Sequence, residues 1–270
     1  MTGTATATVE QVGRSSLGWV EYVGALAVQF WRSLQGIRTL NPFSLHPLRW
    51  RRAIDEMIAA GVGAVPIVAL TAFCSGLILA FQGGSELRKL GALELVIPLV
   101  AIGITREAGP LITAITVSGR SGSAFSAEIG AMVITDEISV LKTMALDPVQ
   151  LLVSPKFLAL LLVMPCLTIV ADFAGLLAGG WFVYSTIGTS LPLYIHAALD
   201  SLYIRDILSG LIKSIIFATL ITQIDCLQGF RVKRSPQDVG RATTSAVVRA
   251  IFLVIVADLL FTALFYVVWP

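Results

Sequence analysis

The chain has 270 residues, of which 56% are hydrophobic and only 13% are charged, and its mean hydropathy is +0.85. Soluble domains carry about 25% charged residues, so this composition excludes an ordinary soluble domain. It indicates a membrane protein that crosses the bilayer several times. A formal net charge of +2 is too small to indicate nucleic-acid binding. Three cysteines and two histidines without metal-ligand spacing predict neither a disulfide nor a metal site.

The first sixty residues differ in character from the rest. Leu17 to Leu40 mixes apolar and polar residues at roughly helical spacing, and Trp19 and Trp31 suit the headgroup level of a membrane. We predict an interfacial helix here; the alternative is a peripheral helix packed on the protein itself. Arg49, Arg51 and Arg52 then form a basic cluster beside the membrane. Residues 1–60 are therefore expected to be a cytoplasmic N-terminus with an elbow helix, and residues 61–270 a five-span domain.

Five long apolar segments predict an all-α membrane protein with five transmembrane helices. The second segment holds Arg106 and Glu107, and an ionisable residue inside a span costs at least about 2.5 kcal/mol, so such residues usually face a cavity or a partner. Gly109-Pro110 is expected to break or kink this helix. Gly175 and Gly179, four residues apart in the third segment, favour close helix approach. The predicted spans are about 62–84, 93–118, 157–187, 207–230 and 246–269.

A short amphipathic helix is predicted between the second and third spans, from Thr135 to Ala145. Thr135 is a plausible N-cap, and Asp136 and Glu137 fall in the first turn, where the helix dipole favours acids. Pro148 is expected to end the helix. A short helix on the cytoplasmic side is a natural docking surface, although its charges are also consistent with a simple solvated face. Ile138, Leu141 and Ala145 would share one side of it.

Lysines and arginines are distributed unevenly over the predicted loops. Thirteen of the nineteen fall in the N-terminal region, the interval from 120 to 156 and the loop from 231 to 241, and three fall on the other side. The positive-inside rule then predicts a cytoplasmic N-terminus and a C-terminus on the opposite face, in agreement with an odd number of spans. The polar segment from 188 to 206 is expected to be an external loop with a short helix.

Charged residues near the second span have two interpretations. Arg106 and Glu107 form either a structural ion pair that steadies a bent helix or a polar point at the edge of a cavity that meets a lipid headgroup. Arg120 and Glu128 are expected to tie the cytoplasmic turn to neighbouring helices.

Two enzyme patterns are incomplete. Gly210 to Ser214 matches only the end of a phosphate loop, so ATP chemistry would have to come from another chain. Gly119-Arg-Ser121-Gly122 matches the short G-x-S-G pattern of intramembrane serine proteases, but neither His46 nor His196 falls in a span to act as the base. We interpret the serines and glycines from 118 to 126 as small residues that let helices pack closely.

The stretch REAGPLITAITVSGRSGSAFSAEIGAMVITDEISVLKTMALDPVQLLVSPK, from Arg106 to Lys156, resembles the MlaE (YrbE) family. These are permease subunits of ABC transporters that work with MCE proteins. The similarity extends over about residues 60–268, through Phe73 to Gly83, Asp206 to Phe217 and Val239 to Thr244. Ala108 departs from the family pattern, where leucine is commoner.

The resemblance implies a homodimer with an ABCG-like helix arrangement, located in a bacterial inner membrane. The implied partners are a second copy of the chain, an ABC ATPase subunit that binds ATP and magnesium, an MCE-domain protein and a STAS-domain protein. The implied cargo is phospholipid, moved between inner and outer membranes, and no cofactor is expected in this chain.

The resemblance also implies roles for individual residues. Lipid-cavity residues would be Leu79, Leu87, Leu90, Arg106 and Glu107. A coupling helix at about 127–146 would contact the ATPase through Glu128, Thr135, Asp136, Glu137, Leu141 and Met144. The alternative hypothesis is a proton-coupled secondary transporter of a hydrophobic substrate, with Glu107, Asp172 and Asp258 as proton relays.

Overall fold

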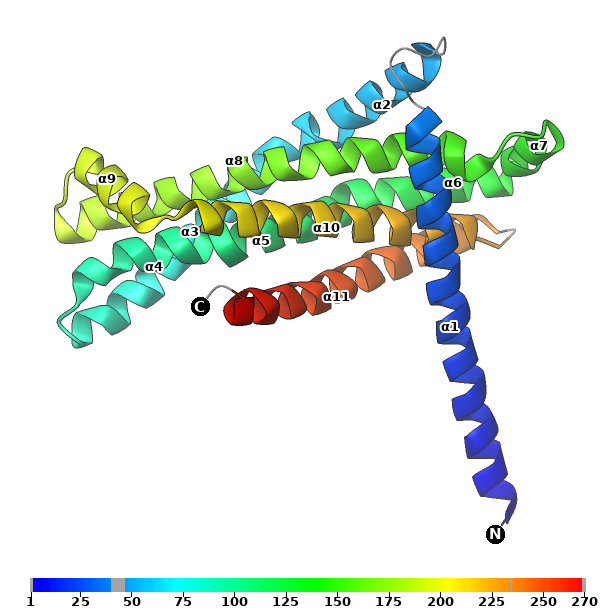
Figure 1. Ribbon diagram of the computed structural model, residues 1–270, viewed down its shortest axis with the longest axis horizontal. Helices are drawn as coiled ribbons and strands as arrows, with labels where there is room; N and C mark the ends of the chain where they lie inside the picture. Colours follow the sequence, from blue (N-terminus) through cyan, green and yellow to red (C-terminus); the bar gives the residue numbers. More distant parts are fainter. Residues whose placement is uncertain (1, 40–46, 234, 269–270) are drawn as a thin grey trace.

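The computed structural model describes residues 2–39, 47–233 and 235–268, and all regular structure in these ranges is helical. Five helices are long and apolar enough to cross a membrane, which confirms the predicted all-α, five-span class. They lie roughly side by side in one bundle, and α1 crosses one end of it at a steep angle (Figure 1). The five long helices are Trp50–Lys89, Leu93–Ile134, Val149–Thr186, Ile204–Phe230 and Pro236–Val267.

Each long helix exceeds the span predicted within it, so the bundle reaches beyond a hydrocarbon core of about 30 Å. The helix from Pro47 continues into the first span, so the basic cluster of Arg49, Arg51 and Arg52 lies on a helix. The first long helix comprises α2 (Pro47–Ala60), η1 (Val62–Ala64) and α3 (Val65–Lys89). The third comprises η5 (Val149–Val153) and α8 (Ser154–Ile187). The last two are α10 (Ile204–Phe230) and α11 (Pro236–Val268).

The second long helix runs without interruption through Gly109-Pro110, so of the predicted break or kink the break does not occur. A proline lacks an N–H group and its ring collides with the carbonyl four residues earlier. Here a π-helical turn directly precedes Gly109 and widens the helix at that point. A second π-helical turn follows. The segments are η2 (Leu93–Leu95), α4 (Val96–Gly103), η3 (Ile104–Ala108), α5 (Gly109–Val117), η4 (Ser118–Gly122) and α6 (Ser123–Ile134).

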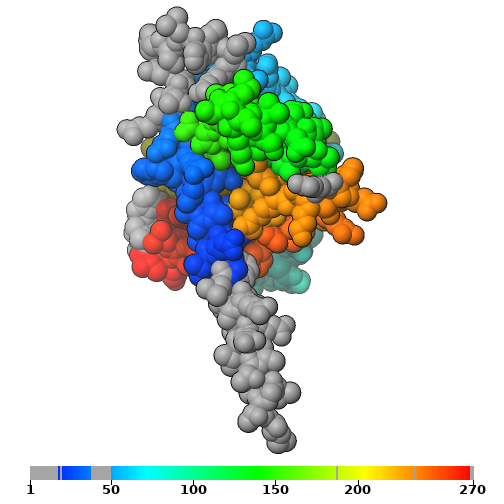
Figure 2. Space-filling model, turned by 90° about the vertical axis from the view of Figure 1, so that its right-hand side faces the viewer, coloured from blue at the N-terminus to red at the C-terminus, as the bar shows by residue number. Residues whose placement is uncertain are grey.

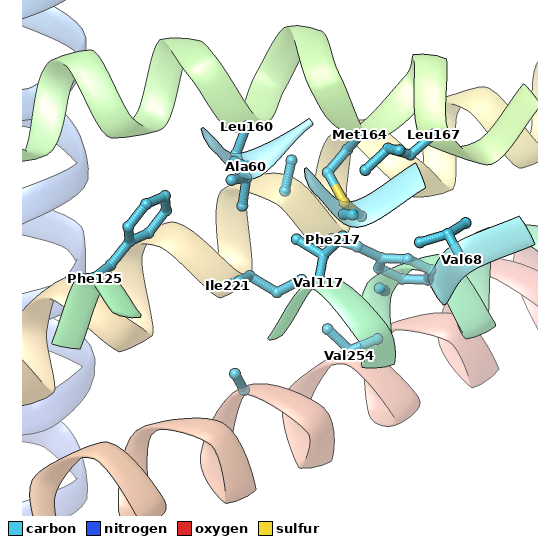
Figure 3. Close-up of a cluster of buried hydrophobic side chains, with 14 of the residues drawn as sticks. Ala60, Val68, Val117, Phe125, Leu160, Met164, Leu167, Phe217, Ile221 and Val254 are labelled. Carbon is cyan, nitrogen blue, oxygen red and sulfur yellow. The ribbon is translucent and has the colours of Figure 1, made fainter. Parts of the chain in front are cut away.

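The main hydrophobic core joins all five long helices. Val68, Val117, Leu160, Ile221 and Val254 come from five different helices and point toward one another (Figure 3). The predicted close helix approach in the third span is confirmed by Gly175, because a Cβ atom on Gly76 of α3 would lie 2.5 Å from its carbonyl oxygen. Without side chains on both glycines, the α3 and α8 backbones come into direct contact, which strengthens their van der Waals packing.

The short helix predicted between the third and fourth spans is confirmed as α9 (Leu191–Ser201). Its Tyr194 is buried, and its hydroxyl donates a hydrogen bond of 2.9 Å to the carbonyl oxygen of Leu176. Burial raises the pKa of Tyr194 to about 12, so the hydroxyl keeps its proton and the bond persists at ordinary pH.

Helix α1 (Thr2–Thr39) is longer than the predicted interfacial helix, which began at Leu17. Gln29 and Ser33 are buried, and the side chain of Gln29 donates to the carbonyl of Gln223 at 2.9 Å while that of Gln223 donates to Ser33 Oγ at 3.0 Å. The opposite face exposes apolar side chains such as Val23 and Trp31. The helix therefore packs on the protein along one side and presents an apolar surface along the other.

Candidate functional site

A polar stripe on α10 faces the first π-helical turn. Asp206, Gly210 and Lys213 are spaced by four and three residues, so they lie on one face of α10. Gly210 is required at the centre, because a Cβ atom there would lie 2.4 Å from the carbonyl oxygen of Thr105 in η3. The missing side chain brings α10 against η3, and the carboxylate and ammonium groups on either side then reach the charges of that turn.

The first contact of this stripe is an ion pair between η3 and the start of α10. Arg106 Nε lies 2.8 Å from Asp206 Oδ1, and the Asp206 side chain is only 4% exposed. Asp206 Oδ2 also accepts a hydrogen bond of 3.0 Å from the backbone N–H of Tyr203, as part of a capping box at the first turn of α10. The Asp206 carboxylate thus caps the N-terminus of α10 and also forms the ion pair with Arg106.

The second contact is a buried lysine shared by two carboxylates. Lys213 Nζ donates to Glu107 Oε2 at 2.6 Å and to Thr262 Oγ1 at 2.8 Å, and lies 2.9 Å from Asp258 Oδ1. The lysine side chain is 1% exposed. Because a lone charge in this environment is very unfavourable, two acids on different helices converge on it. We call Lys213, Glu107, Asp258 and Thr262 the Lys213 cluster.

These contacts bear on one of the two interpretations of Arg106 and Glu107. The two neighbours do not pair with each other, as a structural ion pair would require, because each pairs instead with α10. Arg106 and Glu107 are nevertheless 32% and 41% exposed, whereas Asp206 and Lys213 are almost fully buried. The surface of the single chain therefore carries two half-exposed charges in the middle of an apolar helix. Such charges do not face acyl chains, so a cavity or another protein surface must cover them.

The predicted lipid-binding leucines lie on α3 and its end. Leu79 and Leu87 pack against a second hydrophobic cluster built from α3, α4, α8 and α9. A Cβ atom on Gly103 would lie 3.1 Å from Leu79, which places this leucine beside the start of η3, about one turn before Arg106 and Glu107. Leu90 is 77% exposed at the end of α3. The structure brings Leu79 toward Arg106 and Glu107 but leaves Leu90 at the rim of the bundle.

A second lysine shared by two carboxylates connects three helices at the other end of the bundle. Lys156 of α8 is 2% exposed, contacts Glu56 of α2 and lies 2.6 Å from Glu128 of α6. Its ammonium group also lies 4.7 Å from the centre of the Phe125 ring. We call Lys156, Glu56 and Glu128 the Lys156 cluster. The expectation that Glu128 ties the turn to neighbouring helices is confirmed, and so is that for Arg120, which donates to the carbonyl of Ala59 at 2.9 Å.

The predicted amphipathic helix is present but shorter, as α7 (Glu137–Thr143). The predicted N-cap at Thr135 is wrong: its hydroxyl bonds back to the carbonyl of Ala131 at the end of α6, and Asp136, with φ of 59°, occupies the N-cap position. The predicted stop at Pro148 is also wrong. Ala145, with φ of 57°, turns the chain away earlier, and Pro148 immediately precedes η5.

Helix α7 projects at the end of the bundle beside α1 (Figures 1 and 2). Ile138 is buried against the protein, while Val140 and Met144 are 55% and 64% exposed. Asp136 and Glu137 are exposed as well, and Leu141 is half-buried. The helix thus presents both acidic and apolar side chains at one end of the molecule.

Most of the small residues of η4 and α6 are packed inside the bundle, as predicted, but Gly119 is exposed with open space beside it. Ser118, Ser121 and Ser126 are buried, and a Cβ atom on Gly122 would lie 1.9 Å from Asp225 Oδ2 of α10. Asp225 finds no hydrogen-bond partner among the described residues. No histidine lies in a candidate span of the described ranges, so no base faces Ser121.

Sequence reasoning found the charged residues of both clusters except Glu56 but missed their pairing. Asp206 was placed in an external loop, and Lys213 and Lys156 were noted only by location. The available signal was the stripe of Asp206, Gly210 and Lys213, whose spacing predicts one helix face. It did not identify the partners, because these lie on helices up to about a hundred residues away.

Five long apolar helices, with paired charges inside the bundle and a short helix projecting from its end, define a multi-pass membrane transport subunit. The family described as "Permease MlaE" matches residues 53–264. The chain belongs to this family of ABC transporter permeases.

Individual relatives agree with this assignment. A probable ABC transporter permease protein of Rickettsia prowazekii is 31% identical over 255 residues, 94% of this chain and 96% of the relative. The intermembrane phospholipid transport system permease protein MlaE of Haemophilus influenzae is 32% identical over 214 residues, 79% and 82% of the two chains. Protein TRIGALACTOSYLDIACYLGLYCEROL 1 of Arabidopsis thaliana is 30% identical over 219 residues, 81% of this chain and 63% of the relative.

Proposed function

We propose that this chain is the membrane subunit of an ABC transporter that moves phospholipids. The observation that carries the proposal is the pair of half-exposed charges, Arg106 and Glu107, on the surface of the second long helix. A zwitterionic or anionic headgroup offers partners for both charges, while the apolar helix surfaces around them suit acyl chains. The relative from Haemophilus influenzae is named for intermembrane phospholipid transport, which supports this cargo.

In a homodimer, the second copy of the chain would shield Arg106 and Glu107 from the acyl chains of the membrane. Two copies in an ABCG-like arrangement would enclose a cavity lined by Leu79, Leu87, Leu90, Arg106 and Glu107. Leu79 lies beside the start of η3, and Leu90 lies at the rim, so the set describes a path from the bundle interior to its end. At that end, which carries α9 and Leu90, the expected MCE-domain protein would receive or deliver the lipid.

The force for transport comes from another chain in this proposal. The sequence lacks a complete phosphate loop, and permeases of ABC transporters work with ATPase subunits. The docking surface would be α7 with its exposed Asp136, Glu137 and Met144, and Thr135 and Leu141 would support it. Glu128 contributes through the Lys156 cluster, which connects the base of α6 to α2 and α8. A STAS-domain protein would accompany the ATPase.

The orientation follows from the same arrangement. Most of the lysines and arginines that lie outside the predicted spans are at the end with α7 and α1, so this end faces the cytoplasm of a bacterial inner membrane. The C-terminus then faces the periplasm.

The test is lipid transfer in vesicles reconstituted with the permease and its ATPase and MCE partners. Substituting Arg106→Gln and Glu107→Gln together should reduce transfer of a fluorescent phospholipid at least tenfold, while ATPase co-purification stays intact. The matched control is Glu94→Gln, which changes a carboxylate of the same long helix at its far end. Undiminished transfer in the double variant would remove these residues from the lipid path.

The proton-coupled alternative predicts a different energy source for transport, a pH gradient instead of ATP. It uses Glu107, Asp172 and Asp258 as relays, but Glu107 and Asp258 both contact the ammonium group of Lys213. The half-buried Asp172 of α8 lies apart from this cluster, with its carboxylate against Gly109. Transport driven by a pH gradient without ATP would favour this alternative, and strict ATP dependence would exclude it.

A further inference from the structure

A pocket lies where α1 crosses the beginning of the membrane-spanning part of α11, apart from the Lys213 cluster. It has a volume of about 650 Å³. Tyr22 of α1 forms one side, Arg231 stands at the end of α10, and Arg249 and Phe252 belong to α11. The elements that build it are held together independently of any ligand, because Gln228 donates a hydrogen bond of 3.2 Å to the Tyr22 hydroxyl.

Two arginines contact one aromatic ring in this pocket. The guanidinium carbons of Arg231 and Arg249 lie 4.9 Å and 5.3 Å from the centre of the Tyr22 ring, so at most about 10 Å separates them. Neither forms an ion pair with a carboxylate of the residues that the structure describes, in contrast to Arg106. Two like charges within this distance repel each other, and an anion that contacts both would reduce the repulsion and accept charge-assisted hydrogen bonds.

An apolar stripe begins directly beside the arginines and runs away along α11. Val248, Phe252, Ile255 and Leu259 are 62%, 58%, 49% and 68% exposed. Their spacing of four, three and four residues places them on one helix face, over about 16 Å of helix length. Asp258 lies about a quarter of a turn around the helix from this stripe, and its carboxylate contacts Lys213. The pocket is lined by none of the residues of the proposed transport path.

The shape of the site matches an amphipathic anion. A cationic end with a tyrosine and an apolar stripe extending toward the membrane interior correspond to a headgroup and an acyl chain. The location supports this occupant, because α1 crosses the bundle at this end and exposes Val23 and Trp31, as a helix at the headgroup level does.

We propose that this pocket binds one anionic phospholipid of the leaflet next to α1. Its phosphate lies between Arg231 and Arg249 over Tyr22, and one acyl chain follows the stripe from Val248 to Leu259. The bound lipid would connect α1 to α11 and so hold the crossing helix against the bundle. The site is distinct from the cargo path, and its existence does not depend on which lipid is transported.

The experiment measures lipid retained by the purified full-length chain, by native mass spectrometry after mixing with phosphatidylglycerol or phosphatidylcholine. The wild-type protein should retain phosphatidylglycerol in preference, and the variant Arg231→Gln/Arg249→Gln should retain about tenfold less of it. Arg231→Lys/Arg249→Lys keeps the charge and should recover much of the retention. The matched control is Arg241→Gln, which removes an exposed arginine of the same helix outside the pocket.

Four results would overturn the proposal. Equal retention by the glutamine variant, with an unchanged melting temperature, would show that the arginines do not hold a lipid. Equal retention of both lipids by the wild-type chain would remove the anionic preference, and displacement of phosphatidylglycerol by millimolar inorganic phosphate would indicate a free-phosphate site instead. A cysteine at Phe252 that crosslinks two copies efficiently would show that a second copy of the chain covers the stripe. Lipid transfer by the same variants is measured in parallel, so that failure of this proposed lipid site can be distinguished from failure of the proposed transport function.

Discussion

The bundle contains two buried lysines, Lys213 and Lys156, and each is shared by two carboxylates from two other helices. The difference lies in the surroundings. The carboxylates of the Lys156 cluster are 23% and 53% exposed at the end of the bundle, where water reaches them. Those of the Lys213 cluster are 41% and 14% exposed, within the long helices, where any exposed part faces a cavity or a partner.

This comparison shows how the same arrangement of charges serves two purposes. At the end of the bundle, solvent compensates for an imperfect pair, so the Lys156 cluster is mainly a joint between α2, α6 and α8. Inside the bundle, each unpaired charge is far more costly. The Lys213 cluster is therefore both a requirement for folding and a fixed polar surface on the proposed lipid path.

The largest effect is expected from Lys213→Met. This change leaves Glu107 and Asp258 together without a cation, and breaking a buried pair in this way typically costs about 3–5 kcal/mol. We expect a large drop in melting temperature or no folded protein, measured by thermal unfolding in lipid nanodiscs.

The matched rescue is the triple variant Lys213→Met/Glu107→Gln/Asp258→Asn, which removes all the charges at once. Its stability should return toward that of the wild type, because no uncompensated charge remains. A triple variant no more stable than Lys213→Met alone would show that the lysine acts through packing and not through its charge.

Lys156→Met should be destabilising by less, about 1–3 kcal/mol, because water can solvate Glu56 and Glu128. Both lysine variants would be compared under the same conditions in the same nanodiscs. Equal losses of stability would mean that depth in the bundle does not distinguish the two clusters.

Asp258→Asn is expected to have an intermediate effect. Lys213 keeps Glu107 and Thr262 as partners, so we expect a loss of about 1–2 kcal/mol. The control is Asp200→Asn, an exposed carboxylate on α9 whose removal should leave the melting temperature unchanged. A loss as large as that of Lys213→Met would contradict the sharing of the lysine between two acids.

The smallest effect on stability is expected at the exposed charges of α7. Asp136→Lys/Glu137→Lys should leave the melting temperature nearly unchanged, because both side chains are exposed. The same change should weaken co-purification of the ATPase subunit, because it reverses the charge of the proposed docking surface. An intact complex at high salt would show that the ATPase binds elsewhere.

The comparison also shows what could be predicted from the sequence. Long apolar segments fixed the number of spans, because about 20 apolar residues are needed to cross a bilayer. The motif from Arg106 to Lys156 identified the family over most of the chain. The short helix between the third and fourth spans and the burial of Ser118, Ser121 and Ser126 were also predicted correctly, whereas Gly119 is exposed.

Local boundaries were less predictable. Thr135 resembles an N-cap, but its hydroxyl bonds back to α6, and the left-handed residues Asp136 and Ala145 set the ends of α7 instead. Similarly, Gly109-Pro110 predicts a broken helix. The π-helical turn before it accommodates the proline and keeps the helix continuous.

The sequence by itself determined the membrane class, the helices and the presence of charges inside the spans, because these depend on composition and local pattern. Only the tertiary structure decided which charges neutralise which. Arg106 and Glu107 are neighbours in the chain, yet their partners Asp206 and Lys213 lie about a hundred residues away. The physical reason is that Gly210 lets α10 contact η3 closely. A buried charge then needs an opposite charge from the neighbouring helix, because water does not reach it.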